Sequence, residues 1–394
     1  MADAHPDKKI PRNKDNDYTE EMAARRRAFI AQKTGVGLRH VSSYSIDPAV
    51  LPGNLENFIG VAQAPIGLAG PLLINGEHAQ GDFYAPMATT EGTLVASYNR
   101  GMRLLSEAGG VKTTVIERYM QRAPVFHMGD ARGARDFGQW IDAHIADIRA
   151  AAEATTSVGR LSHVQKFVVG PSCFLRFNYT TGDAAGQNMS GKATLAACQW
   201  IASNYPDEAP FTLSGAIDTD KKHSHMNFMH SRGARVVAEA TIPNELMKAH
   251  MGADNEALFR ARLISMAGGM LAGTTNNGMH SANGLTALFI ATGQDVANIA
   301  ESHAAQTFVE MHQNGDYYWS ITIPSLIVAT YGGGTGLPTQ RECLEMLDCY
   351  GQGKVEKFAE ICASVVLAGE VSLGAAVVAG DWVEAHDKLG RNRP

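Results

Sequence analysis

The stretch Ser214-Gly215-Ala216-Ile217-Asp218-Thr219-Asp220-Lys221-Lys222 places two ammonium groups directly after two carboxylates. Residues 211–213 before it have the character of a short strand that returns to an earlier domain. Neither a helical nor a strand periodicity runs through the stretch itself, so we expect a loop. A charge cluster on a loop is ordinarily a solvated turn. In a dry cleft, however, a cation beside carboxylates stays protonated and can stabilise an oxygen that becomes negative during a reaction.

Composition bounds the classes of protein that come into question. The chain has 394 residues, of which 45% are hydrophobic and 19% are charged. That is enough for a large core and more than one domain, with the balance of a soluble protein. The net charge of −6 gives no basic surface for nucleic acid, so an anionic substrate must meet local cations. The longest apolar run, residues 363–380, contains Glu370 and many small residues, which argues against a membrane span.

The five cysteines are scattered without the spacing of metal ligands. We therefore expect no metal site. Their odd number, together with the absence of a secretory signal, indicates a reducing compartment, and we expect a cytoplasmic protein.

The first part of the chain predicts a tail, a helix and a hairpin. Residues 1–17 are polar and are expected to be disordered, and a helix is expected over 18–33. The Asn75-Gly76 pair predicts a hairpin over residues 71–83. A helix is then expected to begin at Thr89 or Thr90, with Glu91 in its first turn. Glu91 either complements the helix dipole or gives a proton at the edge of a cleft.

Residues 123–212 read as a compact insertion. A helix is expected over 136–152, and the alternation in 164–177 predicts a strand, a turn and a second strand. The glycine-bearing turn 181–189 leads into another helix. Its free N–H groups suit a phosphate, although a plain helix start is the default and the Rossmann glycine spacing is missing.

The second half alternates strands with helices rich in glycine and alanine. Strands are expected over 234–242 and 319–329. Helical segments are expected over 244–250, 339–347, 355–367 and 371–386, and a further helix after Gly293-Gln294-Asp295. The long apolar stretch 263–290 is interrupted at 274–278, with a new helix start near His280 and Asn283. Three glycines, Gly332 to Gly334, form either a flexible turn or a close approach for a phosphate. Asp295 is either a helix cap or a partner for a lysine. His386 is either solvated or carried by a mobile tail to a cleft.

These segments together resemble the 3-hydroxy-3-methylglutaryl-CoA (HMG-CoA) reductase family over most of the chain, from residue 56 to 386. Several separate blocks match in order, namely 56–71, 86–100, 182–189, 220–222, 293–295, 332–335 and 368–380. The pattern is closer to the soluble catalytic domain of class I members than to class II.

The resemblance implies an α+β fold. A large helix-rich domain that binds acyl-CoA would comprise residues 46–122 and 213–394, after an N-terminal tail and helix in residues 1–45. A small ferredoxin-like domain that binds the nicotinamide nucleotide would be inserted at 123–212. It also implies a homodimer, or a dimer of dimers, with active sites at the subunit interface, and no nucleic-acid or membrane partner.

The resemblance also implies roles for individual residues. The catalytic set would be Glu91, Lys221, Asp295 and His386. The set that holds the hydroxymethylglutaryl group would be Arg122, Ser214, Asp220, Lys222 and Asn283. The nucleotide would meet Asp183, Gly186, Gln187, Asn188, Met189, Gly332, Gly333, Gly334 and Thr335.

The implied activity is a two-step hydride reduction of (S)-HMG-CoA to mevalonate and CoA with two NAD(P)H. Lys221 would stabilise the oxyanion, His386 would protonate the CoA thiolate and Glu91 would supply the proton of the second step. Asp295 would control the protonation of Lys221 and Glu91. NADPH is expected, and NADH stays open because Ser157-Val158-Gly159, with Arg160 beside it, replaces the family's usual segment near the 2′-phosphate.

Further departures from the family pattern keep two alternatives open. Leu263 stands where the family has a lysine, with Arg260 and Arg262 nearby as replacements, and Ala216, Ala185 and Gln187 also differ. A reductase of another acyl-CoA is the second hypothesis. A non-catalytic relative that binds CoA thioesters is the third.

Overall fold

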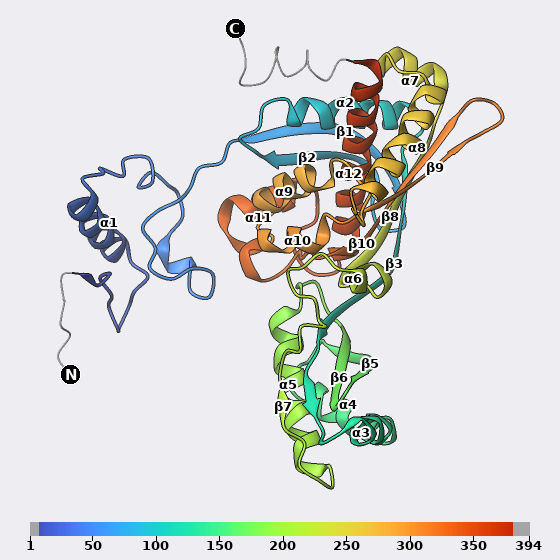
Figure 1. Ribbon diagram of the computed structural model, residues 1–394. Coiled ribbons are helices and arrows are strands. Elements are labelled where there is room, and N and C mark those ends of the chain that lie inside the picture. The colour runs from blue at the N-terminus through green and yellow to red at the C-terminus, as the bar shows by residue number, and fades with distance from the viewer. Residues whose placement is uncertain (1–7, 381–394) are drawn as a thin grey trace.

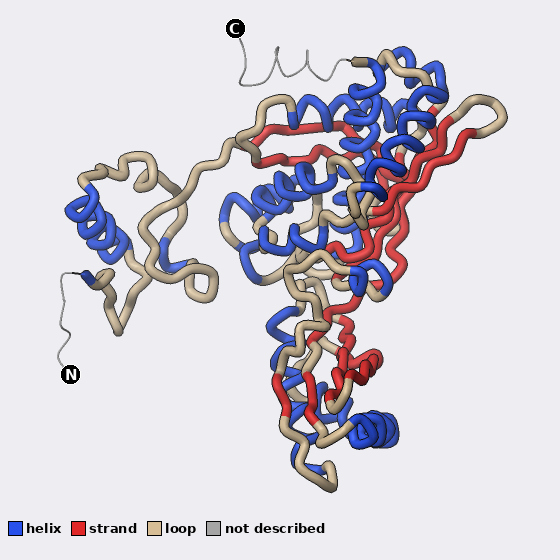
Figure 2. The backbone as a smooth tube through the Cα atoms, viewed as in Figure 1, coloured by secondary structure: helices blue, strands red, loops and turns tan. Residues whose placement is uncertain are grey.

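The computed structural model describes residues 8–380, and it is an α+β protein in which one large sheet is covered by helices (Figures 1 and 2). Within these residues ten strands form the sheet, with the order β7-β4-β6-β3-β8-β10-β9, β1 and β2 beside β3, and β5 beside β6. The strands are β1 (Ile66–Gly76), β2 (Gln80–Ala88), β3 (Val111–Arg122), β4 (Val125–His127), β5 (Arg160–Val169), β6 (Ser172–Thr180), β7 (Phe211–Thr212), β8 (Gly233–Ile242), β9 (Gln306–Met311) and β10 (Tyr317–Leu326).

Strand β3 connects two parts of the molecule. Its residues 112–119 pair with β8 in the large body, and residues 120–122 pair with β6 in the smaller one. The smaller body lies at the bottom of Figure 1, and β3 runs into it from the large body. Because one strand belongs to both parts, side chains near residue 120 stand where the two bodies meet.

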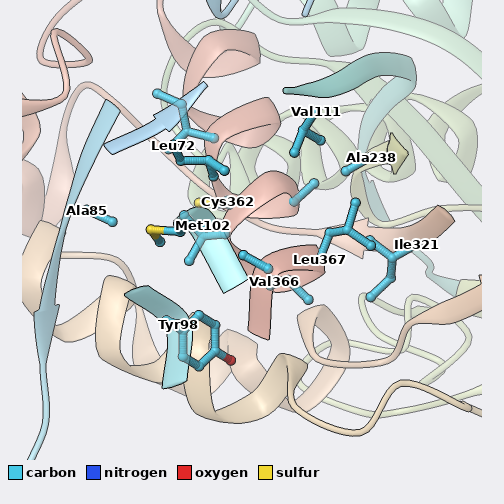
Figure 3. Close-up of a cluster of buried hydrophobic side chains, with 14 of the residues drawn as sticks. Leu72, Ala85, Tyr98, Met102, Val111, Ala238, Ile321, Cys362, Val366 and Leu367 are labelled. Atoms are coloured by element: carbon cyan, nitrogen blue, oxygen red, sulfur yellow. The ribbon is translucent and has the colours of Figure 1, made fainter. Parts of the chain in front are cut away.

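The large body is organised around helix α12 (Val355–Ala379), whose buried face contacts α2 (Leu94–Glu107), β8 and β10. Figure 3 shows Tyr98 and Met102 of α2 beside Val366 and Leu367 of α12, with Val111, Ala238 and Ile321 from three strands. Burial of such aliphatic side chains is the main stabilising term. The other helices here are α6 (His225–Met229), α7 (Asn244–Met251), α8 (Asn255–Leu271), α9 (Ser281–Thr292), α10 (Ile299–Ser302) and α11 (Pro338–Met346).

Helix α12 is continuous, so the prediction of two stretches, 355–367 and 371–386, was wrong for the described residues. The charge at Glu370 does not interrupt the helix, because its carboxylate accepts the N–H groups of Met279 and His280 at 2.5–2.8 Å. Among the described helices, α12 is the one long and apolar enough to cross a membrane, yet 83% of its most apolar window is buried inside the protein.

The smaller body follows the order β-α-β-β-α-β of a ferredoxin-like unit. Strand β4 is followed by α3 (Ala131–Ala143) and α4 (Ile145–Glu153), then by β5, β6, α5 (Gln187–Asn204) and β7. Its own apolar cluster lies between the sheet and α3, α4 and α5. The single helix expected over 136–152 is broken at His144, whose ring stacks on Trp140.

Helix α1 (Glu20–Thr34) projects to the left in Figure 1, and its small apolar cluster contacts the large body at Leu337. The helix, which is capped by Thr19 and ends at Gly35, forms close to the expected range 18–33. Residues 8–17 are not a disordered tail, because Arg26 is buried against them and donates to the carbonyl of Pro11 and pairs with Asp17.

Two local predictions also need correction. The hairpin of β1 and β2 forms, but its turn lies at residues 77–78, two residues beyond Asn75-Gly76, because the Glu360 carboxylate binds the N–H groups of Glu77, His78 and Ala79. Helix α8 begins at Asn255, where the Asp254 side chain caps it, eight residues before the apolar stretch 263–290 begins.

Candidate active site

The loop 214–222 follows β7 and has an unusual backbone. Ala216, Thr219 and Lys221 have φ values of 68°, 56° and 55°, in the left-handed region that non-glycine residues seldom adopt. Such strain persists only where surrounding contacts enforce it. Here the Lys221 N–H donates to Glu301 Oε1 at 3.0 Å, and the Thr219 hydroxyl donates to Asn227. These contacts therefore fix the backbone of the loop that carries Lys221.

The Lys221 ammonium forms an ion pair with Asp295, with Nζ 2.9 Å from Oδ2. Both side chains remain partly exposed, at 44% and 43%. The hydrogen bond that Lys221 donates to Asp295 raises the pKa of Lys221, despite an opposing contribution from desolvation. Asp295 also caps the short 3₁₀ turn η3 (Val296–Asn298) through the N–H of Ala297, so both interpretations of this residue hold.

The fully buried Arg232 contacts two carboxylates next to the Lys221–Asp295 pair. Arg232 lies 2.6 Å from Asp220 Oδ1 and 3.3 Å from Glu301 Oε1. Burial raises the pKa of Glu301, and the Lys221 N–H and Arg232 oppose that rise. Sequence reasoning missed Arg232 and Glu301, because no local signal pairs two charged residues that lie 69 positions apart.

The predicted substrate residues Arg122 and Ser214 meet at a third residue that was not predicted. Arg122 Nη1 lies 3.2 Å from Asp218 Oδ2, and Ser214 Oγ donates to the same oxygen at 3.1 Å. The Asp218 side chain is only 3% exposed. Asp218 therefore already accepts hydrogen bonds from Arg122 and Ser214, two of the residues expected to hold an acyl ligand.

Glu91 and Asn283 form a separate pair, in which Asn283 Nδ2 donates to Glu91 Oε2 at 2.9 Å. Glu91 precedes α2, which begins at Leu94, so its placement in the first turn was wrong; Thr89 accepts its N–H instead. Tyr98 of α2 stacks on His280, at the start of α9, with ring centroids 4.8 Å apart. A Cβ at Gly284 would lie 2.5 Å from the Tyr98 hydroxyl, so glycine is required there. This packing holds Glu91 against Asn283.

The two pairs stand at opposite ends of α9. Asn283 lies in its first turn and Asp295 follows its last residue, Thr292. Nine residues of helix span about 14 Å along the axis. Within the described residues, Glu91 is not an ion-pair partner of Lys221. One chain thus carries two half-sites, which we call the lysine half-site (Lys221, Asp295, Asp220, Arg232 and Glu301) and the glutamate half-site (Glu91 and Asn283).

The two glycine-bearing segments converge on one cavity of about 380 Å³. It is lined by residues 184–189 at the start of α5, by 331–335 beside the turn η4 (Gly333–Gly336), and by Asp295. Gln187 Nε2 donates to Asp220 Oδ1 at 3.3 Å and to Asn298 Oδ1 at 3.0 Å, which ties α5 to the lysine half-site. Asp183 differs from its neighbours, because its carboxylate binds the N–H groups of Lys354 and Val355 at the start of α12.

The remaining candidates have other surroundings. Arg262 is buried and donates to Asn277 and Thr307, and Arg260 pairs with Glu256 on the surface of α8. Neither stands at the lysine half-site. Lys222 Nζ donates to the carbonyl of Asp220 at 2.9 Å. His386 lies outside the described residues.

Comparison with known proteins identifies the family. The model of the hydroxymethylglutaryl-coenzyme A reductase family matches residues 22–391. The chain is 44% identical over 374 residues to 3-hydroxy-3-methylglutaryl-coenzyme A reductase of Pyrococcus abyssi, covering 93% of this chain and 92% of the relative. It is 41% identical over 373 residues to the enzyme of that name from Methanocaldococcus jannaschii, with 93% and 92% covered.

A solved structure has the same fold. It is the class II 3-hydroxy-3-methylglutaryl-CoA reductase from Streptococcus pneumoniae bound to NADPH in open conformations. The TM-score is 0.68 at 21% identity, with 84% of this chain and 89% of that chain covered.

Proposed function

This chain belongs to the hydroxymethylglutaryl-coenzyme A reductase family, and from that premise we propose how its residues reduce HMG-CoA. The protein is an oxidoreductase of the mevalonate pathway. Its reaction converts (S)-HMG-CoA to mevalonate and CoA through two successive reductions of one carbonyl carbon. The residue roles that follow are the proposal.

The lysine half-site stabilises the oxygen that gains charge. In each reduction the carbonyl oxygen becomes negative, and the Lys221 ammonium neutralises it. The Asp295 carboxylate keeps that ammonium protonated, and Arg232 and Glu301 hold the loop so that little reorganisation is needed. A preorganised cation of this kind contributes about 3–4 kcal/mol where water is excluded. When bound, the nicotinamide nucleotide supplies the hydride.

The glutamate half-site serves as the proton source. Glu91 donates a proton to the alkoxide formed from the aldehyde, and Asn283 orients its carboxyl group. His386 protonates the departing CoA thiolate, so that the thiolate does not add back to the aldehyde. Lys222, Asp220, Arg122 and Ser214 hold the acyl group.

A single observation carries this proposal: Asp295, the ion-pair partner of Lys221, lines the cavity on which both glycine-bearing segments converge. Free N–H groups at the start of α5 and the glycine-rich turn at 332–334 suit a phosphate-bearing ligand. The nucleotide there would have its reactive ring beside the cation. Gly186, Gln187, Asn188 and Met189 would contact it on one side, and Gly332, Gly333, Gly334 and Thr335 on the other. Asp183 would act indirectly, by fixing the turn to α12.

NADPH is the proposed cofactor. The segment 157–160 packs beside the nucleotide segment, since a Cβ on Gly159 would meet Met189 and one on Gly182 would meet Val158. Arg160 is 56% exposed and lies 3.9 Å from Glu153, so its guanidinium is accessible to a 2′-phosphate. Arg160→Ala should raise the KM for NADPH by about tenfold and leave that for NADH nearly unchanged. Equal effects on both nucleotides would contradict this assignment.

We also propose a homodimer whose active sites combine two chains. The glutamate half-site of one subunit would face the lysine half-site of the other, which removes the distance of about 14 Å within one chain. Helix α8 supports this arrangement, because Leu263, Ile264, Met266, Met270 and Leu271 on it are exposed, the last two at 78% and 91%. Several exposed apolar side chains grouped on one helix indicate a protein interface.

The domain assignment is part of the proposal. Residues 46–122 and 213–394 would bind the acyl-CoA, residues 123–212 the nucleotide, and the segment 1–45 would precede them. The class I likeness, an assembly of two dimers and a cytoplasmic location remain predictions of the same kind.

Stoichiometry tests the function directly. Purified protein should oxidise two equivalents of NADPH for each HMG-CoA and release one CoA thiol. Oxidation of one equivalent, or of none with either nucleotide, would contradict it. Ligand-induced thermal stabilisation without turnover would favour a non-catalytic CoA-thioester-binding relative.

Mixing two inactive variants tests the shared site. Lys221→Ala and Glu91→Gln subunits, denatured together and refolded, should regain up to about a quarter of wild-type activity, since half the dimers are mixed and each has one intact site. If both half-sites belonged to one chain, mixing would restore nothing, because every mixed dimer would carry one defect in each site.

A further inference from the structure

Asp218 contacts two of the groups proposed to hold the acyl chain, yet the proposed reaction gives it no role. It lies on the loop between Ser214 and Lys221 and is buried beneath it. Its Oδ2 atom accepts both from Ser214 Oγ, at 3.1 Å, and from Arg122 Nη1, at 3.2 Å. Both partners are groups assigned above to the acyl chain of the substrate. The inference therefore rests on the proposed function.

The electrostatic consequence follows from the burial of this pair. The Arg122 side chain is 19% exposed and that of Asp218 3%, so water screens their interaction weakly. An arginine already paired with a carboxylate offers little net charge to a second one. A second carboxylate placed there also meets like-charge repulsion from the first. A neutral acyl chain meets no such cost.

The other cations around the loop are similarly engaged. Lys221 pairs with Asp295, and Arg232 with Asp220 and Glu301. Lys222 is the exception within residues 8–380, since its ammonium donates to a backbone carbonyl and forms no ion pair there. Asp218 therefore decides whether Arg122 is a second cation for the substrate.

We propose that Asp218 is a specificity-determining residue, which neutralises Arg122 and competes with the terminal carboxylate of the acyl chain. A dicarboxylic acyl-CoA must displace it to reach Arg122. An acyl-CoA without that carboxylate binds with the Arg122–Asp218 pair intact. Asp218 thus shifts the substrate preference of the protein toward uncharged acyl chains.

The test compares two substrates that differ only at this end. One is HMG-CoA, and the other is 3-hydroxy-3-methylpentanoyl-CoA, in which a methyl group replaces the carboxylate. Asp218→Asn keeps the size of the side chain and an oxygen acceptor for Ser214 but removes the charge. The ratio of kcat/KM values, HMG-CoA over the uncharged analogue, should rise about tenfold, through a lower KM for HMG-CoA.

Matched variants separate this effect from a structural one. Asp316→Asn makes the same change between β9 and β10, where the Asp316 side chain accepts from Asn314, and should leave the ratio unchanged. In an Arg122→Gln background, Asp218→Asn should no longer raise the ratio. A merely structural role for Asp218 would lower kcat/KM for both substrates by the same factor, and that result would overturn the proposal.

A second measurement covers the case in which Asp218→Asn does not fold. In a structure of the wild-type protein with HMG-CoA, the substrate carboxylate should lie against Arg122, with Asp218 displaced from it. An intact Arg122–Asp218 pair with the carboxylate elsewhere would overturn the proposal. Absence of wild-type turnover would contradict the proposed function instead, so the two failures are distinguishable.

Discussion

Each half-site holds one ionisable group in place, but the interactions that hold Lys221 differ from those that hold Glu91. Lys221 is held by charges: its ammonium pairs with Asp295, and its backbone is tied to the Arg232–Glu301 pair. Glu91 is held by an uncharged partner, Asn283, whose helix is fixed through the stacking of Tyr98 on His280. A cation that must stay protonated benefits from carboxylates nearby. A carboxylic acid that must release a proton is better placed beside a neutral amide, because a cation would hold its proton affinity down. The environments thus match opposite chemical tasks.

The largest expected effect is the loss of the cation. Lys221→Ala should lower kcat by about 10³-fold or more, because the oxyanion loses its charge partner in both reductions. The measurement uses HMG-CoA and, separately, mevaldehyde as substrates. Loss with HMG-CoA but full activity with mevaldehyde would show that Lys221 serves only one of the two steps.

Removal of the acid from the glutamate half-site should have a smaller and uneven effect. Glu91→Gln retains a hydrogen-bonding group for Asn283 but has no proton to give, so mevaldehyde reduction should slow by about 10²- to 10³-fold. Glu77→Gln, in the turn of the first hairpin, is the matched control and should have little effect. If Glu91→Gln slowed mevaldehyde reduction no more than this control, the role of Glu91 as proton donor would be wrong.

The carboxylate of the lysine half-site should appear in the pH profile. Asp295 raises the pKa of Lys221, so the protonated ammonium persists to higher pH than an isolated lysine would allow. Asp295→Asn should therefore move the alkaline limb of the kcat/KM profile to lower pH, with about a tenfold or greater fall in kcat at neutral pH. An unmoved alkaline limb would mean that another group controls it.

Sequence reasoning found the parts of the site that lie on local signals. Asp295, considered as a partner for a lysine, lies beside Lys221, and the two glycine-bearing segments share a cavity. The partners that support them were not predictable, because Arg232 and Glu301 meet across 69 positions and no local pattern pairs two buried charges. The same holds for the fold. Alternation predicted β5 and β6, whereas β3, β4 and β9 were not predicted. The continuity of α12 and the shifted hairpin turn depend on buried Glu370 and Glu360 meeting distant N–H groups.

The smallest expected effect concerns the support of the glutamate half-site in acid. Burial lowers the pKa of His280 to about 4, below its usual 6.5. Between these values the unfolded chain binds a proton that the folded chain does not, so His280 contributes stability that is present above pH 6.5 and is lost as the pH falls toward 4. His280→Asn should lose less stability than the wild type between pH 7 and pH 5, by about 1 kcal/mol in urea unfolding. The lysine half-site has no buried histidine of this kind among its defining residues, so Asp295→Asn should follow the wild-type slope. If all three proteins lost stability in parallel, acid sensitivity would not distinguish the two half-sites.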